Sequence, residues 1–387
     1  MIKRKITDVL LAELNKYPVV TLLGPRQSGK TTLVKNALSN YAYVNLEDPE
    51  LRLMATNDPK GFLKQNSCPL IIDEIQRVPE LLSYIQVIVD ESPKEKGMFV
   101  LTGSQQLNLK ANITQSLAGR TALLKLLPLS INELKNAGVI LERDEYIFKG
   151  FMPRGYQENI APKSLYRNYY ETYIERDVNQ LVNLRNRSLF ELFLKLLAGR
   201  VGQLLNLNSM SGDIGVSSTT LNEWLNVLES SFIIFRLPPY YENFGKRFIK
   251  SPKIYFTEIG LAAYLLEIRN PSQVSRDPLM GNLFENMVIL EALKARYNAG
   301  ENPDLYFFRD QHGFEIDLIK SEHRKITPIE IKSAMTFSPK FTNNLKKFTS
   351  LNDKISNGIL IYSGNQYESY NRVKIMNFKN IESVIMG

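Results

Sequence analysis

The sequence predicts an α/β fold in which a parallel sheet, covered by helices, precedes smaller domains. Over the first 127 residues, short apolar runs alternate with helical segments, as in sheets whose strands are joined by crossover helices. The run from 19 to 23 ends in a glycine-bounded loop, and the run from 70 to 72 ends in Asp73 and Glu74. Both features fit the carboxyl ends of parallel strands, where α/β proteins place their sites.

The composition bounds the class of protein. A chain of 387 residues is too long for one core and predicts two to four domains. The net charge of +8 and the pI near 9.2 make a polyanion such as nucleic acid a candidate partner without establishing one. The single cysteine, Cys68, excludes an internal disulfide framework and fits a reducing compartment.

No targeting or membrane segment is predicted. Residues 1–14 contain Asp8 and Glu13 and are not followed by a cleavage site of small residues. No apolar run approaches the length of about 18 residues that a membrane span needs. We therefore expect a cytoplasmic protein with no membrane partner.

The loop after the first predicted strand has the spacing G-x-x-x-x-G-K-[ST] of a phosphate-binding loop. Its glycines let backbone N–H groups approach phosphate oxygens at a helix N-terminus, Lys30 supplies a charge for the β- and γ-phosphates, and the Thr31 hydroxyl can ligate Mg²⁺. An ordinary glycine-containing turn remains the alternative for one short motif. The predicted ATP-binding residues are Gly24, Pro25, Arg26, Gln27, Ser28, Gly29, Lys30, Thr31 and Thr32.

The acidic pair predicts the chemistry of this site. A helix over 7–15, a helix from Thr31 to about 38 and a strand over 42–46 lead to the stretch PLIIDEIQRVP at 69–79. In this Walker B pattern, Asp73 would hold Mg²⁺ through water and Glu74 would orient or deprotonate the attacking water. The alternative is that these acids only mark a strand that leaves the core for solvent. A position some forty residues after a phosphate loop makes this alternative a poor fit.

Two later features complete the predicted site. The apolar run at 98–104 ends in hydroxyl residues, of which Ser104 is the better candidate to sense the γ-phosphate and Thr102 the second. A helix to about 117 follows, and Arg120 directly precedes a fifth strand at 121–127.

With these motifs, the first 127 residues resemble the AAA+ ATPases. The resemblance implies the strand order 5-1-4-3-2, ATP and Mg²⁺ as cofactors, and a ring-like homo-oligomer in which Arg120 reaches the neighbouring subunit's nucleotide as a catalytic arginine finger. A surface arginine that caps a helix is the alternative. Residues 128–184 then correspond to a helical lid, with helices at 130–137 and 164–182 separated by a turn at 148–153. Arg176 in this segment is only a weak candidate for nucleotide contact.

Residues 185–275 are predicted to form a winged helix. Helices at 189–198, 205–214 and 219–230 precede strands at 231–237 and 253–256. Basic residues interleaved with aromatic rings suit phosphate contact with stacking, and so predict DNA binding, although basic loops are also common on ordinary surfaces. The third helix carries Glu223 and Glu229 and no basic residue, which favours backbone contact over base readout. The residues of this wing are Arg236, Tyr240, Tyr241, Phe244, Lys246, Arg247, Phe248, Lys250 and Lys253.

Residues 276–387 have the predicted order helix 281–297, strands 305–308, 314–319 and 326–332, helix 339–351 and strand 357–362. This order, with Glu285, Asp317 and the sequence Glu330-Ile331-Lys332, resembles the PD-(D/E)XK nucleases, a restriction-endonuclease-like fold. The resemblance implies that Asp317 and Glu330 bind Mg²⁺ with support from Glu285, and that Lys332 acts in catalysis. The family's proline is absent. A half-buried sheet edge with exposed charges, or an inactive relic of the fold, remains open.

The complete order resembles bacterial and archaeal AAA+-like ATPases whose C-terminal half is a domain of unknown function. We expect an ATP-hydrolysing, DNA-associated protein that couples its nucleotide state to the winged helix and the nuclease-like module. The alternative is an ATP-dependent switch that binds a protein partner and uses an inactive nuclease-like domain for recognition. Salt-dependent binding to DNA would separate the two.

Overall fold

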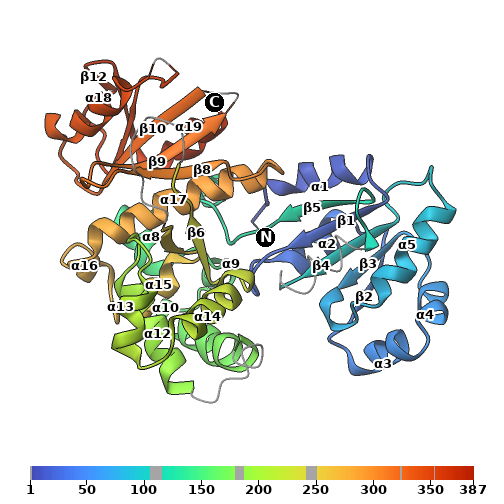
Figure 1. Ribbon diagram of the computed structural model, residues 1–387. Helices are drawn as coiled ribbons and strands as arrows, with labels where there is room; N and C mark the ends of the chain where they lie inside the picture. The colour runs from blue at the N-terminus through green and yellow to red at the C-terminus, as the bar shows by residue number, and fades with distance from the viewer. Residues whose placement is uncertain (1, 105–115, 179–186, 241–250, 323–324, 353) are drawn as a thin grey trace. The chain divides into compact units, whose positions relative to one another are not determined.

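The structure is a computed structural model that describes residues 2–104, 116–178, 187–240, 251–322, 325–352 and 354–387 (Figure 1). The chain forms two compact units. The first contains residues 1–129, 230–232 and 297–301, and the second contains 130–229, 233–296 and 302–387. The predicted division into 1–127, 128–184, 185–275 and 276–387 remains a prediction at this finer level.

The first unit is built on a five-stranded parallel sheet (Figure 1). Its spatial order is β2-β3-β4-β1-β5, which confirms the order implied by the sequence resemblance. β1 and β4 are buried along their whole length because they lie inside the sheet. The strands are β1 Val19–Leu23, β2 Ala42–Asn45, β3 Leu70–Asp73, β4 Phe99–Gly103 and β5 Thr121–Lys125.

Helices position the sheet's loops. α1 and α2 pack over one face of the sheet, where Leu10 and Leu33 join Val20 in a hydrophobic core. α3 and α4 each begin with proline after an aspartate N-cap, Asp48 and Asp58, so a side chain satisfies the first free N–H groups. The helices are α1 Ile6–Leu14, α2 Lys30–Ala37, α3 Pro49–Asn57, α4 Pro59–Gln65 and α5 Leu81–Glu91, with a 3-10 turn, η1, at Ile75–Arg77.

The second unit begins with short helices. The helix expected over 164–182 is present in its described part as α10 followed directly by η2, although the hydrogen bonding changes from α-helical to π-helical at Tyr170. The backbone of Arg176 lies in η2. The turn expected at 148–153 is shorter than predicted, and two unpredicted helices flank Gly150. The elements are α7 Ile131–Asn136, α8 Arg143–Lys149, α9 Pro153–Gln157, α10 Pro162–Tyr169 and η2 Tyr170–Val178.

Three helices and a two-stranded antiparallel sheet follow, in the order expected for a winged helix. The ring of Trp224 packs against Phe190 and Phe193 at centroid distances of 5.4 and 5.6 Å, which joins the first and third helices. Residues 241–250, which contain most of the predicted wing, lie outside the described residues. The elements are α12 Arg187–Gly199, α13 Leu207–Ile214, α14 Ser218–Ser230, β6 Ile234–Leu237, β7 Lys253–Phe256, α15 Ile259–Leu265 and α16 Pro271–Val274.

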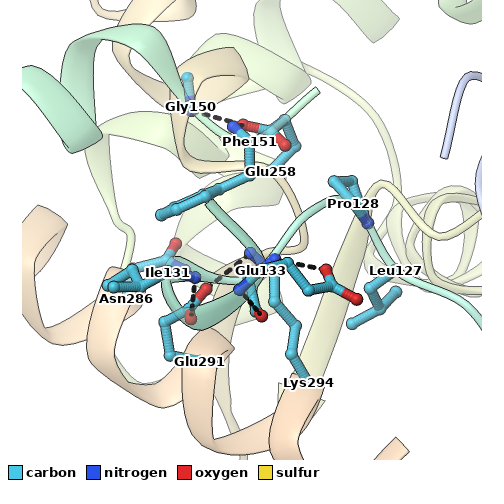
Figure 2. A network of polar contacts seen from close by, with 12 residues as sticks. Leu127, Pro128, Ile131, Glu133, Gly150, Phe151, Glu258, Asn286, Glu291 and Lys294 are labelled. Carbon is cyan, nitrogen blue, oxygen red and sulfur yellow. Dashed lines mark hydrogen bonds and ion pairs between the residues drawn. The ribbon is translucent and has the colours of Figure 1, made fainter. Parts of the chain in front are cut away.

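The long helix α17, Met280–Asn298, anchors the start of the second unit through a buried polar network (Figure 2). The carboxylate of Glu291 accepts hydrogen bonds from the backbone N–H of Ile131 and from the ammonium of Lys294, each at 2.7 Å. Beside it, Ser130 and Glu133 form a capping box, in which each side chain accepts the other's N–H. These bonds satisfy the first turn of α7 without water.

The C-terminal sheet has six strands in the order β12-β13-β11-β10-β9-β8. The strands predicted at 305–308, 314–319, 326–332 and 357–362 are present, but two further strands and a last helix were not predicted. The elements after α17 are β8 Leu305–Arg309, β9 Glu315–Glu322, β10 Lys325–Lys332, η3 Pro339–Thr342, α18 Asn343–Thr349, β11 Ile359–Tyr362, β12 Ser369–Tyr370, β13 Val373–Asn377, η4 Phe378–Asn380 and α19 Ile381–Met386. In the described part of the chain, none of the helices combines the length and apolar character needed to cross a bilayer.

Candidate nucleotide site

The loop between β1 and α2 has the backbone of a phosphate cradle. Gly29, at the N-cap of α2, has a φ of 92°, and Gln27 has a φ of 61°. A Cβ at Gly24 would lie 2.1 Å from the carbonyl oxygen of Leu126, so only glycine fits where the loop crosses the chain that leaves β5. Within the described chain, the buried side-chain atoms Gln27 Oε1 and Ser28 Oγ have no hydrogen-bond partner. These features fit a bound triphosphate.

Lys30 is buried beneath this loop. Its Nζ donates to the carbonyl oxygens of Gly24 and Pro25, each at 2.9 Å. Burial lowers the pKa of Lys30, although Glu74 and Asp73 oppose the change. The ammonium therefore gains from a phosphate that replaces lost hydration.

Asp73 ends β3 and collects three hydroxyl groups. Thr31 Oγ1 and Tyr43 OH each donate to its Oδ2 at 2.7 Å, and Thr102 Oγ1 donates to Oδ1. Burial, together with the hydrogen bond to Asp73, raises the pKa of Tyr43, which therefore acts as a donor. The predicted pair of metal-binding groups, Thr31 and Asp73, is thus in direct contact. The donor set of one hydroxyl and one carboxylate fits Mg²⁺.

Glu74 follows Asp73 but faces a different set of groups. Its backbone is left-handed, with a φ of 59°, which turns the side chain toward the end of β4. There Ser104 Oγ donates to Glu74 Oε2 at 3.0 Å, and Gln76 Nε2 donates to Glu74 Oε2 and, at 3.0 Å, to Ser104 Oγ. The structure therefore brings together the predicted catalytic base and the predicted sensor.

Sequence reasoning missed Tyr43, Gln76 and Arg4. The guanidinium of Arg4, 7% exposed, donates to the carbonyl oxygens of Ser28 and Leu127, each at 2.6 Å. It therefore joins the phosphate loop to the chain that follows β5. No motif marks Arg4, and only the closeness of Gln76 to the acidic pair could have pointed to it.

Two predicted arginines of the first unit form surface ion pairs. Arg26 lies 3.2 Å from Glu47. Arg120 donates to both oxygens of Asp90, at 2.6 and 2.8 Å. Because Val19 N–H donates to the carbonyl of Arg120 at the start of β1, Arg120 lies at the end of the sheet opposite the phosphate loop. Its action on a neighbouring subunit remains a prediction.

The predicted nuclease residues lie in a cluster of carboxylates and lysines. Lys332 Nζ lies 3.0 Å from Asp317 and 2.5 Å from Glu330, and Lys253 Nζ lies 2.9 Å from Glu285. Burial, with help from Asp317, raises the pKa of Glu330 to about 8. Although burial opposes the change, Lys332 and Lys253 lower the pKa of Asp317. In the residues that the structure describes, no group of three or more His, Cys, Asp or Glu side chains is placed to hold a metal ion.

Two basic residues of the predicted wing form ion pairs with acidic residues of the same chain. Lys253 is 2% exposed and also forms an ion pair with Glu315, because β7 faces the C-terminal cluster. The guanidinium of Arg236 donates to Glu229, with its Nε at 2.8 Å. The expectation that Lys253 contacts DNA is therefore wrong, whereas contact by Arg236, whose ion pair with Glu229 is partly exposed, stays a prediction. Tyr241, Phe244, Lys246, Arg247, Phe248 and Lys250 lie outside the described residues.

The phosphate loop, the acidic pair and the strand order define a P-loop ATPase core of the AAA class. A model described as an AAA domain matches residues 16–135. Two domains of unknown function match the rest, DUF8612 at 140–272 and DUF4143 at 280–381.

Several known proteins are similar to this chain over most of its length. The uncharacterized protein Rv2008c of Mycobacterium tuberculosis is 32% identical over 338 residues, which are 86% of this chain and 74% of that protein, and Mb2031c of Mycobacterium bovis gives the same values. An uncharacterized protein of Haemophilus influenzae is 22% identical over 72% of this chain and 75% of its own. The Walker-type ATPase paby2304 of Pyrococcus abyssi is 15% identical, with a TM-score of 0.46 over 69% of this chain and 96% of its own. The chain belongs to the family of the two mycobacterial proteins.

Proposed function

We propose that the protein binds and hydrolyses ATP with Mg²⁺. The observation that carries this proposal is the 2.7 Å hydrogen bond between Thr31 and Asp73, which joins the phosphate loop to the acidic pair. When bound, Mg²⁺ would neutralise the negative charge that develops on the phosphates. Thr31 and Asp73 would hold the ion, the latter through water, and Lys30 would bind the β- and γ-phosphates.

The chain's own residues divide the remaining work. Glu74, oriented by Ser104 and Gln76, would accept a proton from the attacking water or align it. Ser104, at the end of β4, would contact the γ-phosphate. Because Ser104 also donates to Glu74, loss of the γ-phosphate would change the surroundings of the Glu74 carboxylate. The loop residues Pro25, Arg26, Gln27, Ser28 and Thr32 would complete the cradle.

Two variants separate binding from chemistry. Lys30→Ala should abolish nucleotide binding or turnover, whereas Glu74→Gln should bind ATP and hydrolyse it at least about 10²-fold more slowly. Lys60→Ala, which removes an exposed lysine of α4, should behave as the unaltered protein. Calorimetry with ATP and a phosphate-release assay provide the two readouts. Turnover by Glu74→Gln at the parent rate would show that Glu74 is not the base.

We further propose that the protein associates with DNA. The net charge of +8 and the predicted wing support this, although Lys253 is buried and Arg236 is already paired with Glu229. The triple variant Lys246→Gln, Arg247→Gln and Lys250→Gln should then weaken binding to duplex DNA and reduce its salt dependence. Binding unchanged by this variant would remove the wing from the proposal.

Cleavage of DNA by the C-terminal domain is a second candidate function. One observation favours it: Glu330, 1% exposed, has an Oε1 atom without a hydrogen-bond partner in the described chain. Against it, Lys253 and Lys332 already neutralise the carboxylates, which favours the alternative of an ATP switch with a recognition module. Incubation with single-stranded, duplex and branched DNA in Mn²⁺, beside Asp317→Ala and Lys332→Ala, tests cleavage. No cleavage together with no metal binding by calorimetry would favour the switch.

A further inference from the structure

A groove with a volume of about 820 Å³ lies at one end of the C-terminal sheet. Among the described residues, four basic side chains line it: Lys320 on β9, Lys325 on β10, Arg372 just before β13, and Lys374 on β13. We call this surface the basic groove. Neither the nucleotide site nor the predicted nuclease residues contribute to its lining.

Strand register places the three lysines on one face of the sheet. Lys325 pairs with Glu322, Thr327 pairs with Lys320, and Ile359 pairs with Lys374. Paired residues, and residues two apart on a strand, share a face. The cations therefore come from three different strands and converge.

The same register separates the groove from the carboxylate cluster. Along β10, Glu330 and Lys332 are an odd number of residues from Lys325 and Thr327, so they lie on the other face. The seven residue steps from Lys325 to Lys332 also correspond to about 23 Å along the strand. The groove is thus a site of its own.

The described lining of the groove carries four basic side chains and one acidic side chain, Glu322. Lys320 is paired with Glu322 at 2.9 Å, which leaves the exposed Lys325, Arg372 and Lys374. Among the residues that the structure describes, none forms an ion pair with these three. Three cations around one hollow repel one another unless an anion with several charges lies between them.

The other groups in the groove indicate which polyanion fits. Hydroxyl and amide side chains of Thr327, Ser356 and Asn357 stand among the cations, and among the described residues no aromatic ring lines the surface. Such a mixture suits phosphate oxygens, whereas stacking on bases needs rings.

We propose that the basic groove binds the phosphate backbone of DNA. Binding is independent of sequence, because the lining offers contacts to phosphates and none to base faces. The inference requires neither ATP hydrolysis nor the wing, and it adds a DNA contact that neither the predicted nuclease residues nor the predicted wing supplies.

Charge removal with a matched control tests this proposal. The groove variant combines Lys325→Gln, Arg372→Gln and Lys374→Gln in the full chain. The control combines Lys340→Gln, Lys346→Gln and Lys347→Gln, which remove the same charge beside α18. That helix packs through Leu345 and Phe348 onto Ile326, on the other face of the sheet. Fluorescence anisotropy with a random-sequence duplex, measured from low to moderate salt, gives affinity and salt slope.

We expect the slope of log affinity against log salt concentration to become shallower by about 0.9 for each phosphate contact that the groove variant loses. Its affinity at 0.1 M salt should fall on the order of 10²-fold, whereas the control should keep the slope of the unaltered protein. Thermal unfolding by circular dichroism should be similar in both. Parental affinity in the groove variant, or an equal loss in the control, would overturn the proposal. If only the wing variant loses affinity for DNA, the groove is excluded as a DNA contact and the wing is supported. If the unaltered protein does not bind DNA, the groove proposal and the wing proposal are both contradicted.

Discussion

At the scale of single residues, the acidic pair shows how neighbours in the sequence acquire different roles. Asp73 lies in the sheet with hydroxyl donors around it, whereas the left-handed backbone of Glu74 turns its carboxylate toward Ser104. One carboxylate is thus placed for a metal and the other for water. Tyr43, which no motif marked, belongs to the first set.

We expect Tyr43→Phe to raise the Mg²⁺ concentration needed for half-maximal hydrolysis by a few-fold. The change removes the hydroxyl that donates to Asp73 at 2.7 Å but keeps the ring beneath Lys35. The loss of one hydrogen bond to a charged group costs about 1.5–3 kcal/mol at most. The control is Tyr41→Phe, whose hydroxyl donates to the carbonyl of Gly97 instead. An equal Mg²⁺ requirement in the two variants would contradict the role of Tyr43.

Glu330 gives a prediction on pH. Its raised pKa, about 8, means that the folded state holds this proton more tightly than the unfolded state. Stability from this group is therefore fully present below the unfolded value near 4.5 and is lost as the pH rises through about 8. The free energy of unfolding in urea should fall with pH between about 5 and 8, by up to about 1.4 kcal/mol per unit.

Glu330→Gln should flatten this slope, because glutamine does not titrate. The exposed residue change Glu368→Gln should leave the slope as it is. The slope is the readout, since Glu330→Gln also removes an ion pair with Lys332 and so changes the absolute stability. Parallel pH profiles for the parent and Glu330→Gln would show that Glu330 is ionised in the folded protein.

At the scale of elements, the segment before α1 acts as a clamp. Arg4 donates to the carbonyl oxygens of Ser28 and Leu127, so it joins the phosphate loop to the chain that follows β5. Gly24 makes the same junction tight from the other side, against Leu126. The clamp lies outside residues 16–135, the part matched as an AAA domain.

We expect Arg4→Ala to lower the midpoint of thermal unfolding and to raise the KM for ATP, because it leaves buried carbonyls unsatisfied at about 1–3 kcal/mol each. Arg4→Lys should recover only part of both, since an ammonium cannot match the planar fork of arginine. The exposed neighbour Lys3 provides the control, as Lys3→Ala. If the KM for ATP is unchanged in Arg4→Ala, Arg4 contributes to stability only and not to ATP binding.

The elements also show what a sequence can predict. The strands of the first unit were found from apolar runs, and their order followed from a family resemblance, because the motifs are local and specific. Lys253 was misjudged as a wing residue because its partners, Glu285 and Glu315, lie 32 and 62 positions further on. β12 has only two residues, too few for any periodicity, and so it was missed.

At the scale of the whole molecule, Arg120 raises the question of assembly. Its position at the end of the sheet opposite the phosphate loop prevents it from serving its own site. A chain that acts alone would therefore not use it, whereas an arginine supplied in trans can be worth about 10³ to 10⁵ in rate.

We expect hydrolysis to depend on protein concentration and to fall in Arg120→Ala. Mixing Arg120→Ala chains with Lys30→Ala chains should restore part of the activity, since some interfaces then combine an intact loop with an intact arginine. Asp90→Ala, which removes only the partner of Arg120 within its own chain, should retain activity. Concentration-independent hydrolysis that is unchanged in Arg120→Ala would contradict assembly.

The first unit also draws on distant parts of the chain, and this affects how it is made. Residues 297–301 belong to it, and Tyr297 lies under the ammonium of Lys125, 4.9 Å from the ring centroid. At about 5–20 residues per second, a ribosome needs roughly 10–30 s to travel from residue 129 to residue 297. For that time the nascent ATPase unit lacks part of itself, so its final folding must wait for α17, and a chaperone could hold it meanwhile.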